Sequence, residues 1–348
     1  IPDNVVYISS SAFYGCKSLT DINVTENNKY YSSSAGLLFD KNKTELIKCP
    51  AGKSLKNFNI PNGVKSLDRY SFCNCSNLTS INIPESVTYI GIGAFYLCTN
   101  LKSIAIPDSV TKIENITFTG CSSLTSISIP ESVTYIGLNA FKDCTSLTSI
   151  YIPDSVTLTG LSGTFSGCTS LTNVKLPDVI YIINTNTFAG CSSLLNIIIP
   201  DSVTSIKECA FEGCKSLTNI AIPESVTKIG TWAFKDCTSL KSIAINNPDC
   251  EISNAKDTIP ETAVICGYEN STAQAYAERY CRRFVSIEDI GDISGNGEID
   301  LYDAIEISKA IMGLRTFTDE EMLIADFNMD GTVDLYDAIE IARTLLPK

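Results

Sequence analysis

The chain has 348 residues, of which 44% are hydrophobic, and this favours two or three folded domains over a disordered chain. The formal charge is −13, and residues 291–348 alone hold thirteen acidic and four basic residues, so nucleic acid is a poor partner because no basic cluster exists. Histidine is absent, which removes the commonest general base, the triads built on it and most zinc sites.

Two further exclusions follow from the distribution of apolar residues. No run of eighteen apolar residues occurs, so we expect no membrane span. The start at Ile1 shows no signal-peptide pattern, as expected of a mature or trimmed product.

Internal repeats fill residues 1–245. One copy reads CSSLTSISIPESVTYIGLNAF, and the same residue types recur in some nine copies. The repeat prolines are 23 residues apart, with one interval of 24: Pro61, Pro84, Pro107, Pro130, Pro153, Pro177, Pro200 and Pro223.

The spacing of apolar residues within one copy predicts its shape. The alternation in SISIP predicts a short strand that ends at the proline, which cannot donate a ladder hydrogen bond, and SVTYIG predicts a second strand. One turn cannot bury its apolar face alone, so stacked turns should share a core as a solenoid. The inward-facing set in this copy is Cys121, Leu124, Ile127, Ile129, Val133, Ile136 and Phe141.

The motif CxSLxSIxIPxSVxxIGxxAF resembles the BspA-like subclass of leucine-rich repeats, from residue 1 to about 245. The resemblance implies a leucine-rich-repeat solenoid with short β-strands in each turn. Residues 25–59 are also similar to that family. They predict a β-hairpin that turns at residues 40–43 and is inserted between the first and second turns.

The cysteines divide into a repeat set and a remainder. We expect the repeat set to be a stack of buried reduced thiols, because equivalent side chains in a solenoid point in parallel and cannot pair. A disulfide among Cys250, Cys266 and Cys281 stays open. So many thiols suit an anaerobic setting. The repeat set is Cys16, Cys75, Cys98, Cys121, Cys144, Cys168, Cys191, Cys214 and Cys237.

Two outward stripes are candidates for a solenoid ligand. The outward positions of the first strand are mostly Ser, Asn and Ala and offer no aromatic platform for sugar rings. The second stripe carries tyrosine and lysine, which could bind a protein or glycan, although an ordinary solvated face has the same composition. Its candidate ligand residues are Tyr89, Lys112, Tyr135, Tyr181 and Lys228, with Leu158 and Ser205 between them.

The repeat fails from residue 246. Residues 246–288 predict a capping region with one strand-like patch, AVICGY, and one helix that begins near Ser271. Residues 285–291 form the linker that follows. They lack a Pro, Ser or Gly tract, so limited freedom is expected between the parts.

The octapeptide DLYDAIEI occurs twice in residues 289–348, and each copy closes a loop with EF-hand spacing. Side-chain oxygens stand at positions 1, 3, 5, 9 and 12, a backbone carbonyl at 7 and a glycine at 6. We therefore predict two calcium ions. The predicted ligands are Asp292, Ser294, Asn296, Glu298, Asp300 and Asp303 in the first loop and Asp326, Asn328, Asp330, Thr332, Asp334 and Asp337 in the second.

Each loop runs directly into a predicted helix, and a third helix is predicted between them, where Thr318 and Glu321 have the spacing of a capping box. The Asp at position 12 and the lack of a preceding helix resemble the dockerin module. Dockerins are small all-α modules with two EF-hand-like calcium loops that bind cohesin domains of a scaffoldin in cellulosomes.

The resemblance implies which side chains contact cohesin. Positions 10 and 11 of each loop and the helix face that follows them are involved, and the identical copies suggest two binding orientations. Leu and Tyr replace the Ser–Thr pair of the best-known dockerins, which leaves the class of cohesin open. The implied contacts are Leu301, Tyr302, Ile305, Lys309, Leu335, Tyr336, Ile339 and Arg343.

Together these features predict a non-catalytic, extracellular, cell-surface cellulosome component of an anaerobic bacterium. Its solenoid would recognise an unknown protein or glycan. The alternatives are an inhibitor, a fragment of a larger enzyme, or a solenoid that is only a passive spacer. The regular repeat offers no coupled nucleophile and base and no paired acids, so no catalytic residue is predicted.

Overall fold

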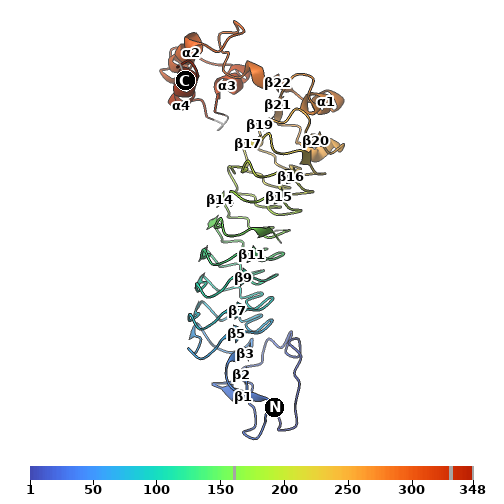
Figure 1. The fold of residues 1–348 in the computed structure, drawn as a ribbon, viewed down its shortest axis with the longest axis vertical. Coiled ribbons are helices and arrows are strands. Elements are labelled where there is room, and N and C mark those ends of the chain that lie inside the picture. The colour runs from blue at the N-terminus through green and yellow to red at the C-terminus, as the bar shows by residue number, and fades with distance from the viewer. Residues whose placement is uncertain (160–161, 329–331, 347–348) are drawn as a thin grey trace.

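The computed structural model describes residues 1–159, 162–328 and 332–346. A long column of stacked turns is followed by a small helical module at the end far from the N-terminus (Figure 1). The predicted solenoid and the predicted all-α C-terminal module are therefore confirmed.

The first strands of the turns pair in parallel in three sheets along one side of the column, and residues 196–199 of one turn form no strand. Each strand residue pairs with the residue at the same position in the neighbouring turn, as Ser126 does with Ser103. The strands are β4 (Asn57–Asn59), β6 (Ser80–Asn82), β8 (Ser103–Ala105), β10 (Ser126–Ser128), β12 (Ser149–Tyr151), β14 (Asn173–Lys175), β17 (Asn219–Ile222), β19 (Ser242–Ile245), β21 (Val264–Gly267) and β22 (Phe284–Ser286).

The second strand of each turn forms another parallel stack, which begins with the last strand of the hairpin. These strands are β3 (Glu45–Lys48), β5 (Ser66–Leu67), β7 (Tyr89–Ile90), β9 (Lys112–Ile113), β11 (Tyr135–Ile136), β13 (Leu158–Thr159), β15 (Ile182–Ile183), β16 (Ser205–Ile206), β18 (Lys228–Ile229) and β20 (Glu251–Ile252).

The insert is a three-stranded antiparallel meander. The predicted turn at residues 40–43 joins β2 (Leu37–Asp40) to β3, and β1 (Tyr31–Ser34) pairs with the other edge of β2. Because β3 also pairs in parallel with β5, the insert is built into the solenoid wall.

One core runs the length of the solenoid. The repeat phenylalanines are fully buried and stacked, with neighbouring ring centroids 5.3–5.7 Å apart and interplanar angles of 2–15°. Stacking of this kind adds to the free energy gained from burying each ring. The stack consists of Phe72, Phe95, Phe118, Phe141, Phe165, Phe188, Phe211 and Phe234.

All fifteen cysteines lie in the described part of the chain and are free thiols. Eight of the nine repeat cysteines are buried, as predicted. Cys16 is exposed, and the prediction was wrong there because residues 1–30 form turns and irregular backbone rather than a stacked turn. Cys250 and Cys266 are also buried, whereas Cys281 is exposed.

Helix α1 (Thr272–Arg279) lies in the region that was predicted to cap the far end. It begins after Ser271, whose hydroxyl accepts a hydrogen bond from the Gln274 backbone, and it packs beside β20 and β21. The 3-10 turn η1 (Lys256–Thr258) precedes it. The start of the expected linker at residues 285–291 belongs to β22 and to a second 3-10 turn, η2 (Ile287–Asp289).

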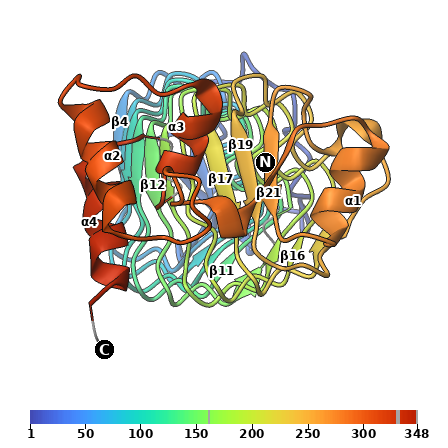
Figure 2. The same ribbon diagram turned by 90° about the horizontal axis from the view of Figure 1, so that it is seen from above.

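The C-terminal module consists of α2 (Leu301–Ile311), α3 (Asp319–Ala325) and α4 (Leu335–Thr344). Seen along the column, α2 and α4 lie at its edge, α3 lies nearer to β17 and β19, and α1 lies on the opposite side (Figure 2).

Candidate functional site

The repeated octapeptide folds identically in its two places. Asp300 and Asp334 each cap a helix in extended backbone, with φ of −138° and −139°. Their side chains each accept a hydrogen bond of 2.7 Å from the backbone N–H of the tyrosine two residues later. The aspartates at loop position 12 complete the capping boxes, so local chemistry alone fixes how each helix starts.

In the first loop, two of the predicted ligands accept hydrogen bonds from the loop's own backbone. The Asp292 carboxylate accepts backbone hydrogen bonds from Asn296 (3.1 Å) and Gly297 (2.7 Å), and Gly297 has a φ of +86° that suits glycine. The Asp303 carboxylate accepts one from Ser294 at 2.8 Å. These bonds close the loop on itself.

The second loop repeats this closure where it is described. The Asn328 N–H donates to Asp337 at 3.1 Å, which corresponds to the bond from Ser294 to Asp303. The predicted ligand Asp330 lies outside the described residues, and Thr332 lies just after the gap.

The donor set fits a hard cation. Among the described residues, no three Asp, Glu, Cys or His side chains already gather as they would around a metal ion. The first loop instead mixes carboxylate, amide and hydroxyl oxygens, to which the Glu298 carbonyl would add. Such oxygen donors, without imidazole or thiolate, suit calcium rather than zinc.

The helix faces predicted to contact a partner are exposed and nearly equivalent. Leu301 and Leu335 are 58% and 57% exposed, and Tyr302 and Tyr336 are 68% and 67% exposed. On the opposite faces α2 and α4 pack together. The buried residues of this contact are Ala304, Ile307, Ala338 and Ile341.

The two faces diverge further along the helices. Ile305 is exposed and Ile339 only half-buried, and Arg343 is exposed. Lys309 pairs with Glu306 at 2.6 Å, and Glu306 also pairs with Arg315. These two cations hold the pKa of Glu306 below its usual value, Lys309 having the larger effect.

The residues of the predicted solenoid stripe differ in their exposure. Tyr89 and Lys112 are exposed, Tyr135 is half-buried, and Lys228 pairs with Glu251 at 2.9 Å. The side chain of Leu158 lies outside the described ones. Ser205 is buried.

Tyr181 does not belong to the stripe, because Ile182 is the residue that pairs with Ser205. The extra residue of the 24-residue repeat falls between Leu158 and Phe165, before Tyr181, which shifts the register by one.

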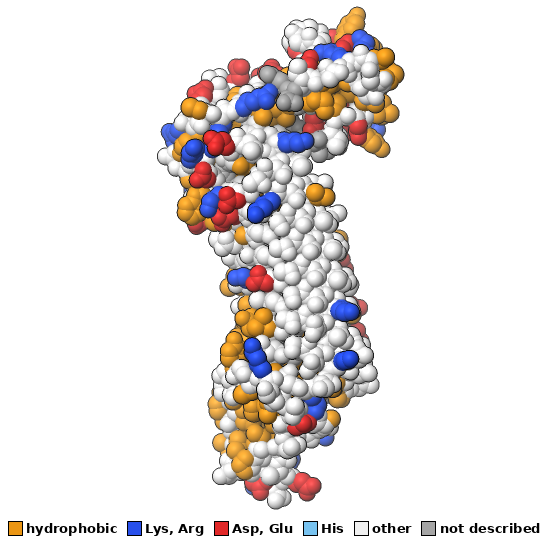
Figure 3. Space-filling model, turned by 180° about the vertical axis from the view of Figure 1, so that it is seen from behind, with side chains coloured by type: hydrophobic (Ala, Val, Ile, Leu, Met, Phe, Trp, Pro, Cys, Tyr) orange, Lys and Arg blue, Asp and Glu red, His pale blue; other side chains and the backbone are white. Residues whose placement is uncertain are grey.

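A second aromatic surface was missed by the sequence analysis. The rings of Tyr14 and Tyr96 meet that of Tyr70 edge-on, with centroids 6.2 and 6.4 Å apart and interplanar angles of 75° and 88°. In this tyrosine cluster, Tyr70 stands two residues before the core residue Phe72, and Tyr96 directly follows Phe95. Hydrophobic side chains gather on the N-terminal part of the column on the face shown in Figure 3. Tyrosine directly after the repeat phenylalanine, at Tyr14 and Tyr96, was the available signal.

Known proteins resemble this chain in both of its parts. The family described as BspA type leucine rich repeat region matches residues 1–52, 47–162 and 161–256, and the dockerin type I domain matches residues 290–346. The chain belongs to the BspA-type leucine-rich repeat family.

Solved structures support this assignment. A leucine-rich repeat protein from Bacteroides ovatus is 30% identical over 68% of this chain and 69% of its own, with a TM-score of 0.55. One from Eubacterium ventriosum is 32% identical over 61% of this chain, with a TM-score of 0.53, and this chain spans 57% of its length. No curated protein matches.

BspA-type repeats and dockerins are non-catalytic types of module. Dockerin type I domains generally bind calcium. Among the described residues, no helix combines the length and the apolar character that crossing a bilayer requires.

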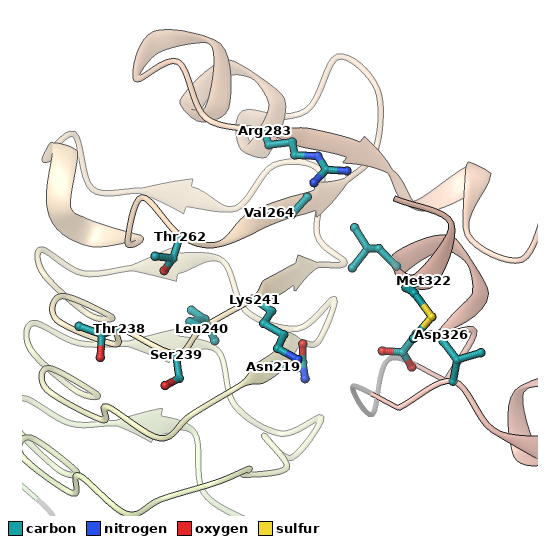
Figure 4. Close-up of a pocket in the computed structure, with 12 residues that line it drawn as sticks. Asn219, Thr238, Ser239, Leu240, Lys241, Thr262, Val264, Arg283, Met322 and Asp326 are labelled. Atoms are coloured by element: carbon teal, nitrogen blue, oxygen red, sulfur yellow. The ribbon is translucent and has the colours of Figure 1, made fainter. Parts of the chain in front are cut away.

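A cleft of about 480 Å³ lies between the dockerin and the last solenoid turns, beside the place where they touch (Figure 4). Lys241 and Arg283 line it on the solenoid side, and Met322, Leu323 and Asp326 line it on the dockerin side. Asp326, the first predicted ligand of the second loop, therefore lies beside the contact between the modules.

Proposed function

We propose that this protein is a non-catalytic component of a cellulosome-type assembly, outside the cell of an anaerobic bacterium. Its dockerin binds a cohesin of a scaffoldin in a calcium-dependent way. The observation that carries this is the pair of exposed Leu–Tyr steps, which start two identically capped helices. Exposed apolar side chains repeated in this way indicate a partner surface.

Two calcium ions are proposed, one for each loop. The first loop would hold its ion through Asp292, Ser294, Asn296, Asp300 and Asp303, with the Glu298 carbonyl. The second offers four carboxylates against three and should bind more tightly. When bound, the ion neutralises the loop carboxylates and holds the two ends of each loop together. Ion binding therefore contributes to folding of the dockerin.

Either helix can lead in the cohesin complex, because both contact faces begin with a Leu–Tyr step of nearly the same exposure. Tyr302→Ala and Tyr336→Ala should each reduce affinity only slightly, whereas the double variant should lose at least a hundredfold, as the loss of hot-spot tyrosines does. Calorimetry with purified cohesin in calcium measures both.

Large and equal losses in the two single variants would contradict binding in two orientations. Tyr268→Ala serves as a control, since Tyr268 is an exposed tyrosine outside the dockerin. Equal affinity in calcium and in chelator would contradict calcium dependence.

For the solenoid, recognition of a protein is supported better than recognition of a glycan. Rings of the tyrosine cluster meet edge-on and form no flat platform for a sugar, whereas tyrosine is enriched in protein interfaces. Binding assays of the full chain against plant polysaccharide, bacterial cell wall and secreted protein, with Tyr14→Ala/Tyr96→Ala as the variant, separate the two. Binding of polysaccharide alone would overturn this assignment.

A further inference from the structure

The dockerin is packed against the last strands of the solenoid. Ala244 of β19, Cys266 of β21 and Ile290 form a small buried cluster, and Leu323 and Phe327 of the dockerin pack against it. Ala221, the partner of Ala244 in the preceding turn, is exposed. The contact therefore buries strand positions that face solvent in the turn before.

Phe327 connects this contact to the second calcium loop. It stands between Asp326 and Asn328, the ligands predicted at positions 1 and 3, and its ring also packs on the dockerin core. If Asp326 and Asn328 both bind the ion, the backbone between them is fixed, and with it the direction of the Phe327 side chain.

The first loop begins at the same place. A Cβ added to Gly291 would lie 2.7 Å from the Phe327 ring, and the Gly291 N–H donates to the Ile324 carbonyl at 2.8 Å. Asp292, the first predicted ligand of the first loop, follows directly. The first ligands of both loops thus flank the contact between the dockerin and the solenoid.

We propose that calcium binding to the dockerin closes its contact with the solenoid, so that the ions fix the direction in which α2 and α4 are presented to a partner. This rests on the proposed calcium binding. Without calcium, repulsion between Asp326 and the other predicted carboxylate ligands shifts Asp326 and Asn328, which withdraws Phe327 from Ala244 and Cys266. Coupling is reciprocal, so docking on the solenoid in turn raises the calcium affinity.

Cys266 provides the readout, because it is only 2% exposed and lies under the dockerin. The full chain is alkylated with a maleimide in calcium and in chelator, and labelling is mapped by peptide mass spectrometry. Cys266 should be protected in calcium and react at least tenfold faster in chelator. Cys250, in the solenoid core, should stay protected in both, and the exposed Cys281 should react in both.

A matched pair of variants tests the coupling from the solenoid side. Ala244→Lys blocks docking without altering the dockerin, and Ala221→Lys places the same charge one turn earlier, at an exposed position. In calorimetry, Ala244→Lys should weaken calcium binding by about tenfold, a typical coupling between sites, and Ala221→Lys should not. Cys266 should also lose its calcium protection only in Ala244→Lys.

The two proposals fail in different ways. If calorimetry detects calcium binding but Cys266 is labelled equally in calcium and in chelator, calcium binding stands and the coupling is overturned. Equal calcium affinities of the two lysine variants would also overturn it. Absence of any calcium heat would overturn both proposals.

Discussion

Each turn of the solenoid bends at two residues whose backbone lies in the left-handed region. The first stands two positions before the core phenylalanine, and the second stands two positions after it. Around Phe95 these residues are Gly93 and Leu97, with φ of +63° and +57°. Residues other than glycine cost about 1–2 kcal/mol there. The bend nevertheless recurs, because it directs the phenylalanine into the core stack.

Two bulky left-handed residues, Tyr70 and Leu97, are each followed by a left-handed glycine in the next turn. A Cβ added to Gly93 would lie 2.5 Å from the Tyr70 ring, and one added to Gly120 would lie 2.5 Å from Leu97. The long side chain thus lies along the column and covers the glycine that follows it.

Gly93→Ala should therefore destabilise the solenoid by roughly 2 kcal/mol or more, from the left-handed backbone and the overlap with Tyr70. Thermal unfolding of the full chain measures the loss. Gly63→Ala is the control, because its φ is not positive and nothing lies within 4 Å of the added Cβ. Tyr70→Ala/Gly93→Ala should regain part of the loss, and a Gly93→Ala chain as stable as the control would refute the pairing.

Burial of the repeat cysteines could be predicted from the sequence, but their hydrogen bonds could not. The Cys121 thiol donates to the Phe95 carbonyl at 3.2 Å, and the same bond recurs from Cys98 to Cys237. This bond joins one turn to the next, so the residues of a single copy give no sign of it.

At the scale of elements, the residues before the hairpin depend on one side chain. Asn28 is fully buried, and its amide donates to the Pro2 and Val5 carbonyls at 2.7 and 3.2 Å while its oxygen accepts from the Tyr30 and Tyr31 backbone. All its hydrogen-bonding groups are engaged. It joins residues 2–5 to the start of β1, in a segment that has no strand of its own.

Asn28→Ala should free this segment, because four hydrogen bonds are lost and each backbone group left unpaired costs about 1–3 kcal/mol. Hydrogen exchange should rise at least tenfold in residues 1–30 and stay unchanged beyond β5. Asn27→Ala is the matched control, since Asn27 is exposed. Equal exchange in the two variants would show that Asn28 does not hold the segment.

The helices of the dockerin were predictable because their signals are local. The Thr318 and Glu321 capping box at α3 is formed, as are both Asp caps. The position of Tyr181 was not predictable. The site of the extra residue in a 24-residue turn depends on which residue reaches the core. A fixed count along the chain cannot reveal that.

At the scale of the whole molecule, two cores of different kinds are joined. The solenoid core extends from Leu37 to Ala277, and the dockerin has its own small core. The existence of both modules follows from repeat spacing and loop motif. Their contact does not, because it depends on how surfaces far apart in the sequence match once both modules are folded.

The column of buried thiols should make the whole molecule sensitive to alkaline pH. Burial raises the pKa of Cys121 and of Cys168 to about 12, and it also raises the pKa of Cys98, Cys144 and Cys191. In an unfolded chain the cysteine thiol has a pKa of about 8.5. Below that pH the thiols are neutral in both states, so stability is unaffected. Above it only the unfolded chain releases protons, so the free energy of unfolding falls until the folded thiols ionise too.

Each such thiol lowers the free energy of unfolding by up to about 1.4 kcal/mol per pH unit. The buried thiols together should therefore lower it by several kcal/mol between about pH 9 and 10. Denaturant unfolding from pH 7 to 10 in reductant measures the slope. Cys121→Ala/Cys168→Ala should reduce that slope by the share of two thiols, whereas replacing the exposed Cys16 and Cys281 should not change it. A flat profile, or equal slopes in the two double variants, would show that burial of the thiols does not set the alkaline limit.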